Sequence, residues 1–317
     1  MKCRICGNDE DNQRYEAREM MIGSKDAFCY FQCSKCQCLQ IEDVSNMSKF
    51  SSNNYNSYKT ITQKKNRLKK ILIGLRDKYA ISGKSIIGKF MYDKFPKEDL
   101  RSLNILALNK DTKILDIGCG AGDLLYSLRE YGMKNLLGVD PFNLKDIQYE
   151  NGLLIEKKEI NDVDGKWNIV MLHHSFEHFP DPSKALQTVS GLMTANGHCI
   201  IRIPLVTSYA WEHYGVNWVQ LDAPRHLYLH SVKSMNFLAD KAGLDIYKIV
   251  YDSTSFQFWG SEQYAKDMPL CDERSYSANP ENSVFTKRDI SSFAKRAKEL
   301  NETKQGDQAV FYLRNQK

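Results

Sequence analysis

The sequence lacks any long apolar run. No stretch approaches the roughly 20 residues that a bilayer-spanning helix needs, and the first ten residues, MKCRICGNDE, contain no apolar core of the kind that a signal peptide has. Internal repeats and low-complexity tracts are also missing. We therefore expect a cytoplasmic protein, in which cysteines stay reduced or bind metal instead of forming disulfides.

A strong excess of charge of one sign is absent as well. Lysine plus arginine exceed aspartate plus glutamate by 44 − 39 = 5 in 317 residues. Such a mild excess permits an anionic substrate, but it gives little reason to expect binding to nucleic acid. The length exceeds that of a usual single domain, so we expect one large domain and an accessory module.

Cysteines, in contrast, are grouped near the start of the chain. Two C-x-x-C pairs are separated by 33 − 6 − 1 = 26 residues, and their members are Cys3, Cys6, Cys33 and Cys36. The two-residue gap in each pair lets both thiolates face one point, which suits a tetrahedral metal ion. We predict a zinc ribbon over residues 1–42, whose structural zinc has no open position for chemistry. Cys29 or Cys38 could instead replace one ligand, and a set of free buried thiols is the alternative to a metal site.

The segment KILDIGCGAGD, residues 113–123, predicts a strand, a glycine turn and a helix. Its glycines alternate, as a backbone that bends tightly and approaches a ligand requires. They are Gly118, Gly120 and Gly122. This G-x-G-x-G spacing differs from the G-x-G-x-x-G of dinucleotide binders, so a NAD-type oxidoreductase is disfavoured. A second predicted strand at 135–139 ends in Asp140, whose carboxylate can accept both hydroxyls of a ribose.

The strand, loop and acid resemble the cofactor site of the class I S-adenosylmethionine-dependent methyltransferases. The resemblance implies a set of contacts to S-adenosyl-L-methionine, namely Asp116, Gly118, Cys119, Gly120, Gly122, Asp140 and Pro141. Several acids between positions 156 and 164 compete for the contact to adenine, and we choose Asp162. The alternative is a glycine turn that only lets a helix pack on a sheet.

Strands and helices alternate along the rest of the chain. Five more strands are predicted at 153–157, 167–173, 198–203, 244–252 and 309–313, with helices at 183–193 and 231–242. Seven strands interleaved with helices predict an α/β sheet covered on both faces. The resemblance implies a Rossmann-like seven-stranded sheet within a domain at 113–317, whose last strand is antiparallel and lies between the fifth and sixth. It also implies that residues 253–308 are an insertion on the substrate side.

Residues 43–112 are expected to form a linker and helices that cap the cofactor. A basic helix predicted at 64–79 carries its apolar side chains on one face. We favour a solvated basic face on a helix packed against the main domain, with contact to an anionic membrane surface or to substrate phosphates as the alternative. Tyr55 and Tyr58 resemble tyrosines that approach the active site in zinc-ribbon methyltransferases, so we assign them to the substrate.

The fourth strand runs into HHSFEHFPDP, residues 173–182. Methyltransferases acting on amino groups of bases usually carry an N-P-P-Y type motif here, and this chain has none. The segment instead resembles the small-molecule branch, which includes quinone O-methyltransferases. His174 and His178 are therefore candidate bases, with a histidine-bound metal as the alternative.

A long segment, residues 204–230, follows the fifth strand at the expected ligand end of the sheet. We predict that Trp218 lines an apolar wall, that Arg225 pairs with a phosphate or carboxylate, and that His226 is the base. An imidazole has an ordinary pKa near 6.5, which suits proton removal at neutral pH. A hydrogen bond that only pins the loop is the alternative for His226. The P-R-H-L sequence resembles a feature of zinc-ribbon methyltransferases from glycan and natural-product clusters.

Together these observations predict a methyltransferase that acts on a small polar acceptor. The most specific expectation is O-methylation of a sugar hydroxyl in a nucleotide-linked or carrier-linked glycan precursor. C-methylation is one alternative, and a non-enzymatic zinc-ribbon binding protein with a vestigial cofactor domain is the other. The sequence does not predict the oligomeric state.

Overall fold

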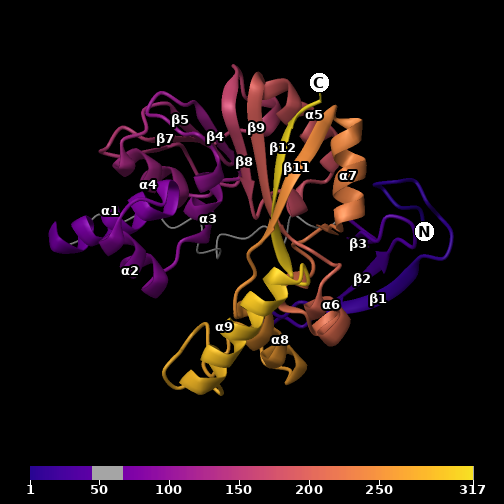
Figure 1. Ribbon diagram of the computed structural model, residues 1–317. Coiled ribbons are helices and arrows are strands. Elements are labelled where there is room, and N and C mark those ends of the chain that lie inside the picture. The colour runs from indigo at the N-terminus through magenta and orange to yellow at the C-terminus, as the bar shows by residue number, and fades with distance from the viewer. Residues whose placement is uncertain (45–66, 317) are drawn as a thin grey trace.

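A computed structural model describes residues 1–44 and 67–316 (Figure 1). Tyr55, Tyr58 and the start of the helix predicted at 64–79 lie outside these described residues. Within them, no helix is both long and apolar enough to cross a membrane.

The large sheet contains eight strands among the described residues. In chain order they are β4 (Ile114–Ile117), β5 (Leu136–Val139), β6 (Ile147–Gln148), β7 (Leu154–Glu156), β8 (Trp167–His173), β9 (Met193–Pro204), β11 (Leu244–Tyr251) and β12 (Gln308–Asn315). The spatial order is β11-β12-β9-β8-β4-β5-β7-β6, and β12 is antiparallel to both β9 and β11. The Rossmann-like sheet and the place of its last strand are thus confirmed. The additional strand β6, only two residues long, pairs antiparallel with β7 at the edge.

Side chains of the central strands alternate between two hydrophobic cores, because successive residues of a strand point to opposite faces. In β8, Val170 and Leu172 join one core, while Ile169 and Met171 join the other. Helices α5 (Pro182–Leu192) and α7 (Val232–Lys241) cover the first face, and α4 (Asp123–Tyr131) covers the second. Both faces of the sheet are therefore buried, as parallel strands require.

A second, smaller sheet lies near the N-terminus (Figure 1). Its strands are β1 (Gln13–Arg18), β2 (Ala27–Gln32), β3 (Leu39–Ile41) and β10 (Tyr228–Leu229), in that spatial order. Strand β10 comes from the 204–230 segment and pairs antiparallel with β3. The segment also folds into the short helix α6 (Tyr209–Tyr214) and is almost entirely buried from Trp218 to Ser231. What looked like a long loop is therefore packed against the cysteine module.

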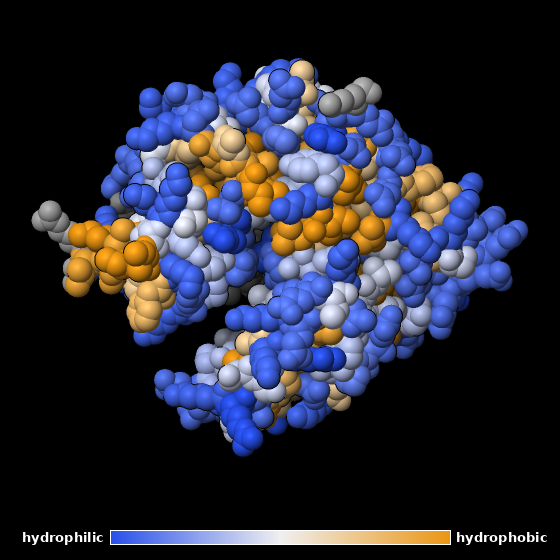
Figure 2. Space-filling view, in the orientation of Figure 1, coloured by the Kyte–Doolittle hydropathy of each residue, from blue (hydrophilic) through white to orange (hydrophobic). Residues whose placement is uncertain are grey.

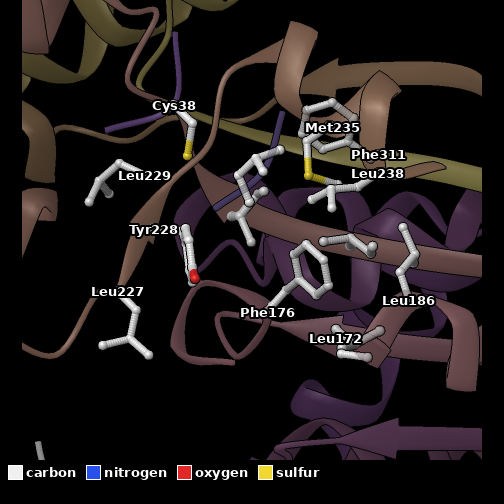
Figure 3. Close-up of a cluster of buried hydrophobic side chains, with 14 of the residues drawn as sticks. Cys38, Leu172, Phe176, Leu186, Leu227, Tyr228, Leu229, Met235, Leu238 and Phe311 are labelled. Atoms are coloured by element: carbon white, nitrogen blue, oxygen red, sulfur yellow. The ribbon is translucent and has the colours of Figure 1, made fainter. Parts of the chain in front are cut away.

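One hydrophobic core joins this module to the large sheet (Figure 3). Cys38 and Tyr228 approach it from the small sheet, whereas Phe176 follows β8 and Met235 comes from α7. All four side chains are fully buried. Because apolar burial is the main stabilising term in folding, the module is bound to the main domain by its core as well as by β-pairing.

Helices near the chain's middle and end form two outlying groups (Figure 1). The first contains α1 (Arg67–Ser82) and α2 (Ile86–Lys94), and the second contains α8 (Phe256–Ala265) and α9 (Lys287–Glu302). The short helix α3 (Glu98–Arg101) and the end of α1 pack on the second core of the large sheet. The apolar stripe of the basic helix was expected to pack on the main domain. That expectation is wrong for its first half, where Leu68 is 64% exposed and Ile71 is 53% exposed. These side chains stay in solvent because the start of α1 projects away from the sheet (Figure 1).

Candidate functional site

The glycine loop joins β4 to α4 at the carboxyl end of the sheet. Gly118, Gly120 and Gly122 have φ values of 72°, 55° and 82°, which disfavour any residue with a Cβ atom. A Cβ on Gly118 would lie 2.4 Å from the Cβ of Ser175, and one on Gly122 would lie 2.4 Å from Cδ1 of Ile155. Gly118 and Gly122 are therefore needed for close packing, and the contact of this loop with a cofactor stays a prediction.

Asp140 holds the loop to the end of β5. Its Oδ2 accepts a hydrogen bond from the Gly120 amide at 2.8 Å, and its Oδ1 accepts one from the Phe142 amide at 2.9 Å. Burial raises the pKa of this carboxyl, although the two amides act in the opposite direction. Each oxygen retains a lone pair, so Asp140 can position the loop and still accept hydroxyl groups.

Two residues that the sequence did not single out also fix the loop. Asn143 donates from Nδ2 to the Gly120 carbonyl at 2.8 Å, and the Tyr149 hydroxyl donates to the Ala121 carbonyl at 2.7 Å. Both side chains are buried. No motif marks them, because their role depends on how the chain folds back after β5.

Asp116 gives the loop its electrostatic character. Burial raises the pKa of its carboxyl well above the ordinary value, and the neighbouring acids Asp99 and Asp140 raise it further. Within residues 1–44 and 67–316, no donor forms a hydrogen bond with this carboxyl. Three acids gathered around one loop favour a cationic ligand, and S-adenosylmethionine carries an ammonium and a sulfonium group.

The remaining predicted cofactor residues differ in their burial. Cys119 and Pro141 are half-buried beside the loop, whereas Asp162 is exposed at the end of the 3-10 turn Ile160–Asp162. Glu156 ends β7 and pairs with Val139, directly beside Asp140. Asp162 remains a prediction for the adenine contact, and the structure adds Glu156 as a second acid at this edge.

A carboxylate and two histidines gather next to the loop. Glu177, His178 and His226 place one side-chain ligand atom each within 4.8 Å of the others. Glu177 and His178 belong to the 3-10 turn Phe176–His178 after β8, while His226 comes from the 204–230 segment. Ser175 precedes this turn, donates to the Ile117 carbonyl at 2.8 Å and is the residue that excludes a Cβ at position 118. The cluster is thus fixed directly beside the cofactor loop.

The two histidines of the cluster are held in the same way. Nδ1 of His178 lies 2.8 Å from the Arg225 carbonyl, and Nδ1 of His226 lies 2.8 Å from the Gln220 carbonyl. A carbonyl only accepts, so each Nδ1 carries the proton and each neutral ring keeps its lone pair on Nε2. Burial lowers the pKa of His226, which favours this neutral form.

Glu177 is the buried acid of the group. Its side chain is fully buried, and neither oxygen receives a hydrogen bond from the described part of the chain. Burial raises the pKa of this carboxyl, but the His174 imidazole 3.7 Å away opposes burial, as does positive charge whenever His178 or His226 takes up a proton, and together these lower the pKa to about 2.

His174 is less suited to accept a proton than His226 or His178. It has a left-handed backbone with φ of 50° and is largely exposed. Its Nε2 lies 3.0 Å from Nη1 of Arg202, which can only donate. The lone pair of His174 is therefore already engaged, and Nδ1 faces Glu177.

Trp218 and Arg225, predicted to contact the substrate, lie inside the protein. Trp218 is fully buried, and its Nε1 donates to Asp307 at 2.9 Å. Arg225 is 8% exposed and forms ion pairs with Glu19 at 2.8 Å and with Asp222. In this structure both side chains therefore hold the 204–230 segment in place instead of facing an open acceptor site. The residues that would have revealed this, Glu19 and Asp307, lie far away in the sequence.

The four paired cysteines converge beside the small sheet. The Sγ atoms of Cys3 and Cys36 are 3.6 Å apart, and those of Cys6 and Cys33 are 3.5 Å apart. These separations are too long for disulfides and close to the roughly 3.8 Å expected for thiolates around a tetrahedral zinc. Gln40 Nε2 donates to Cys3 Sγ at 3.1 Å. The donor set therefore fits zinc, with Cys29 exposed and Cys38 buried beside His230 outside the cluster.

A cavity of about 810 Å³ lies elsewhere, between α1 and the outer side of α4. Basic side chains such as Lys70, Lys78 and Lys110 line it. It includes no residue of the histidine cluster and none of the three loop glycines. We therefore place the candidate site at the glycine loop and the histidine cluster, where Glu177 lacks a hydrogen bond from any described residue and where the Nε2 lone pairs of His178 and His226 lie.

Comparisons with known proteins identify a methyltransferase domain in this chain. A family model described as a methyltransferase domain matches residues 92–249, about half of the chain. The ubiquinone biosynthesis O-methyltransferase of Colwellia psychrerythraea is 32% identical over 98 residues, which are 27% of this chain and 39% of that protein. The protein of the same name from Acinetobacter baylyi is 28% identical over 170 residues, which are 46% of this chain and 70% of that protein. The first of these relatives is thus matched over well under half of its own length.

Among solved structures, a SAM-dependent methyltransferase from Archaeoglobus fulgidus is similar to this chain. The identity is 18% and the TM-score is 0.41. The match covers 72% of this chain and 99% of the other.

Proposed function

Because residues 92–249 form a class I S-adenosylmethionine-dependent methyltransferase domain, we propose that the protein transfers a methyl group from S-adenosylmethionine to a hydroxyl oxygen of a small polar acceptor. In its most specific form, the acceptor is a sugar hydroxyl in a nucleotide-linked or carrier-linked glycan precursor. The observation that carries the proposal is the pair of unprotonated Nε2 atoms, on His178 and His226, beside the glycine loop.

The residues around the loop suit this cofactor. Asp140 would accept the ribose hydroxyls, and Asp116 would face the positive charge of the ligand. When bound, S-adenosylmethionine supplies a methyl group on a positively charged sulfur, which an oxygen lone pair can attack. The chain's own task is to orient the acceptor and remove its proton.

His226 is our first choice for the base, with His178 second. The proton of the acceptor hydroxyl moves to Nε2, while Nδ1 stays bonded to a backbone carbonyl that fixes the ring. The Glu177 carboxylate lies 3.8 Å from Nε2 of His226 and stabilises the imidazolium that forms. His174 follows in third place because Arg202 occupies its lone pair.

Oxygen is preferred to nitrogen as the methyl acceptor. The segment after β8 lacks the N-P-P-Y type motif of amino-group methyltransferases, and its E-H-F-P-D-P sequence resembles the small-molecule branch. The P-R-H-L segment supports a glycan or natural-product substrate. The relatives named for ubiquinone biosynthesis are also O-methyltransferases, which supports the type of transfer but not the sugar.

Calorimetric titration with S-adenosylhomocysteine tests the cofactor site. Wild-type protein is expected to bind it with micromolar affinity, and Asp140→Ala is expected to lose binding. Asp111→Ala is the matched control, because that acid is exposed before β4 and should bind normally. A folded wild-type protein that does not bind the ligand would contradict the proposal.

The acceptor is identified by incubation with S-adenosylmethionine carrying a ¹³C-labelled methyl group. Sugar nucleotides, carrier-linked sugars and phenols serve as acceptors in parallel. The methyl carbon shift in the product distinguishes O-methylation from C-methylation. A methyl carbon bonded to carbon in every accepted product would overturn the oxygen assignment while leaving the methyltransferase assignment intact.

A further inference from the structure

The Glu177, His178 and His226 cluster has the composition of a metal site. We propose that these three side chains bind one divalent transition-metal ion beside the cofactor loop, separately from the four-cysteine site. Three independent features support it: an unpartnered buried carboxylate, two imidazoles oriented by backbone carbonyls, and a short distance between their free atoms.

The Glu177 carboxylate needs a partner. It is fully buried, and neither oxygen accepts a hydrogen bond from the described residues. The imidazoles of His174 and His226 approach Oε1 only to 3.7 Å and 3.8 Å. Buried polar atoms normally form hydrogen bonds or bind a metal. A cation between Glu177 and the histidines would satisfy this carboxylate.

The histidines are oriented as metal ligands usually are. A ligating imidazole commonly donates its other N–H to a carboxylate or a backbone carbonyl, which fixes the tautomer and aims the lone pair. His178 and His226 both donate from Nδ1 to backbone carbonyls at 2.8 Å. Both Nε2 lone pairs are thus available to one ion, together with the carboxylate.

The distances require only a small adjustment. One ligand atom from each residue lies within 4.8 Å of the others, and Oε1 of Glu177 is 3.8 Å from Nε2 of His226. Ligands about 2.1 Å from a tetrahedral ion are about 3.4 Å apart. Two imidazoles and one carboxylate leave further coordination positions open, as in catalytic zinc sites and non-haem iron sites.

The open positions suggest which acceptors the enzyme takes, and this part rests on the proposed methyl transfer. An ion held by one carboxylate keeps net positive charge and attracts oxygen ligands. An acceptor with two adjacent oxygens, such as a vicinal diol or a hydroxyl next to a carbonyl, would occupy two positions at once. The ion would then lower the pKa of the coordinated hydroxyl, whose proton would pass to solvent. A histidine whose Nε2 binds the ion cannot accept that proton, so in the metal-loaded protein the ion replaces the histidine base.

Cobalt titration tests the site. Protein whose four-cysteine site is first filled with zinc is titrated with Co²⁺ by calorimetry and visible absorption. We expect one cobalt per chain, with no sulfur-to-cobalt charge-transfer band. Glu177→Gln and His178→Gln should each weaken binding by at least about 100-fold, since each loses a direct ligand. His213→Gln is the matched control, because that exposed side chain stacks on Tyr209 away from the cluster.

Several outcomes would overturn the metal site. These are no cobalt uptake by the wild type, uptake only with a sulfur charge-transfer band, and undiminished binding by both variants. Circular dichroism and thermal melting verify that each variant is folded. S-adenosylhomocysteine titration of the same samples separates the two proposals: ligand binding without cobalt binding leaves methyl transfer standing, and cobalt binding without ligand binding leaves the metal site standing.

A second surface is supported by a different observation, the apolar end of the α1–α2 pair. Ile86 is 91% exposed, Ile87 is 60% exposed and Phe90 is 70% exposed on α2, which packs against α1. Figure 2 shows apolar residues gathered over these helices at the far left of the molecule. Exposed apolar groups of this size mark interaction sites more often than chance solvent exposure.

We propose that this end of α1 and α2 docks on an anionic membrane surface. The occupant is indicated by charge, because exposed lysines accompany the apolar side chains: Lys84 lies just before α2, and Lys89, which also pairs with Asp93, and Lys94 lie on it. Apolar residues that enter the lipid boundary, flanked by lysines that contact anionic headgroups, are typical of interfacial helices.

Vesicle sedimentation tests this surface. The wild type is expected to bind phosphatidylglycerol-containing vesicles, less so as salt rises, and not to bind pure phosphatidylcholine. Ile86→Ser with Phe90→Ser should abolish binding, while Val284→Ser, at an exposed apolar residue of the insertion, should not. Absence of vesicle binding would overturn the proposal, as would a wild-type dimer that the double variant converts to a monomer, since a second copy would then cover the surface.

Discussion

The cofactor loop and the 204–230 segment meet at the same end of the sheet, but they are held by different kinds of contact. The loop is fixed by residues 20 and 23 positions further along the chain: Asp140 and Asn143 bind Gly120, and both follow the next strand, β5. The 204–230 segment is fixed by distant residues, including Glu19 on Arg225 and Asp307 on Trp218. A ligand site can therefore combine a part fixed by the adjacent strand, here the glycine loop, with a part fixed only by contacts of the complete fold, here the 204–230 segment.

Of the changes considered, loss of zinc is expected to have the largest effect on the 204–230 segment, with little effect on the cofactor loop. The sequence alone predicts that removing zinc unfolds the ribbon and leaves the large domain standing. The structure adds β10 to the ribbon's sheet, so Cys33→Ser should also loosen residues 222–231. Structural zinc contributes on the order of 10 kcal/mol to the folding of a small module.

Hydrogen exchange read by mass spectrometry measures the extent of that loosening. Amides of β3 and β10 should lose protection together, while β4 and β5 keep theirs. Cys29→Ser is the control, because that thiol is exposed and outside the cluster. If residues 222–231 keep full protection in Cys33→Ser, the segment does not depend on the ribbon.

Acid should lower the stability of the fold through protonation of His230, which lies at the end of the 204–230 segment. Burial lowers the pKa of this imidazole to about 4, despite the opposing influence of Glu177. The unfolded chain therefore binds a proton more readily, and stability is lost as pH falls from about 6.5 to about 4. For a shift of this size the loss is about 3 kcal/mol.

Urea unfolding at pH 7.5 and pH 4.5 measures how much His230 contributes to this loss of stability. The difference in unfolding free energy between the two pH values should be smaller in His230→Gln than in the wild type. His213→Gln, which changes an exposed histidine, should match the wild type. Equal pH dependence in His230→Gln and wild type would show that His230 does not govern the acid sensitivity.

On the cofactor side, Gly118→Ala should destabilise the protein by about 1–3 kcal/mol, because the new Cβ would lie 2.4 Å from Ser175 in a tightly packed turn. Gly152→Ala provides the matched control, since Gly152 has a φ of 80° but no atom within 4 Å of its added Cβ. Both variants carry the left-handed strain, so the difference between their unfolding free energies measures the clash. Equal losses would mean that the loop relaxes away from Ser175.

The smallest expected effect belongs to Trp218→Phe. The substitution removes the hydrogen bond from Nε1 to the buried Asp307 carboxyl while keeping most of the apolar surface. Gln220 still donates to the same oxygen, so the cost should be near the lower end of about 1–3 kcal/mol. Chemical unfolding measures it, and unchanged S-adenosylhomocysteine affinity would confirm that the loss is confined to the acceptor side.

The sequence predicted the elements that depend on short patterns. Strand β8 begins and ends at the predicted residues. Helices α5 and α7 each begin and end within one residue of the prediction. The glycine loop and Asp140 also came together as expected, because parallel strand ends share one edge of the sheet.

Long-range partners could not be predicted in this way. The sequence predicts that Arg225 pairs with a phosphate or carboxylate of the substrate, whereas in the structure its partner Glu19 lies far away in the sequence. The orphaned Glu177 was likewise recognised only in the structure, since the sequence shows its neighbours but not its lack of hydrogen bonds. Burial and pairing of single charges depend on the complete fold.

Strand β10 has a consequence for protein engineering. Because residues 228–229 complete the sheet of the cysteine module, the 204–230 segment and the first 42 residues form one exchangeable unit. A chimera that takes the segment from a related enzyme will need the donor's ribbon as well. Recombination points therefore belong after the ribbon and around β9 and β11, with both pieces coming from the same parent.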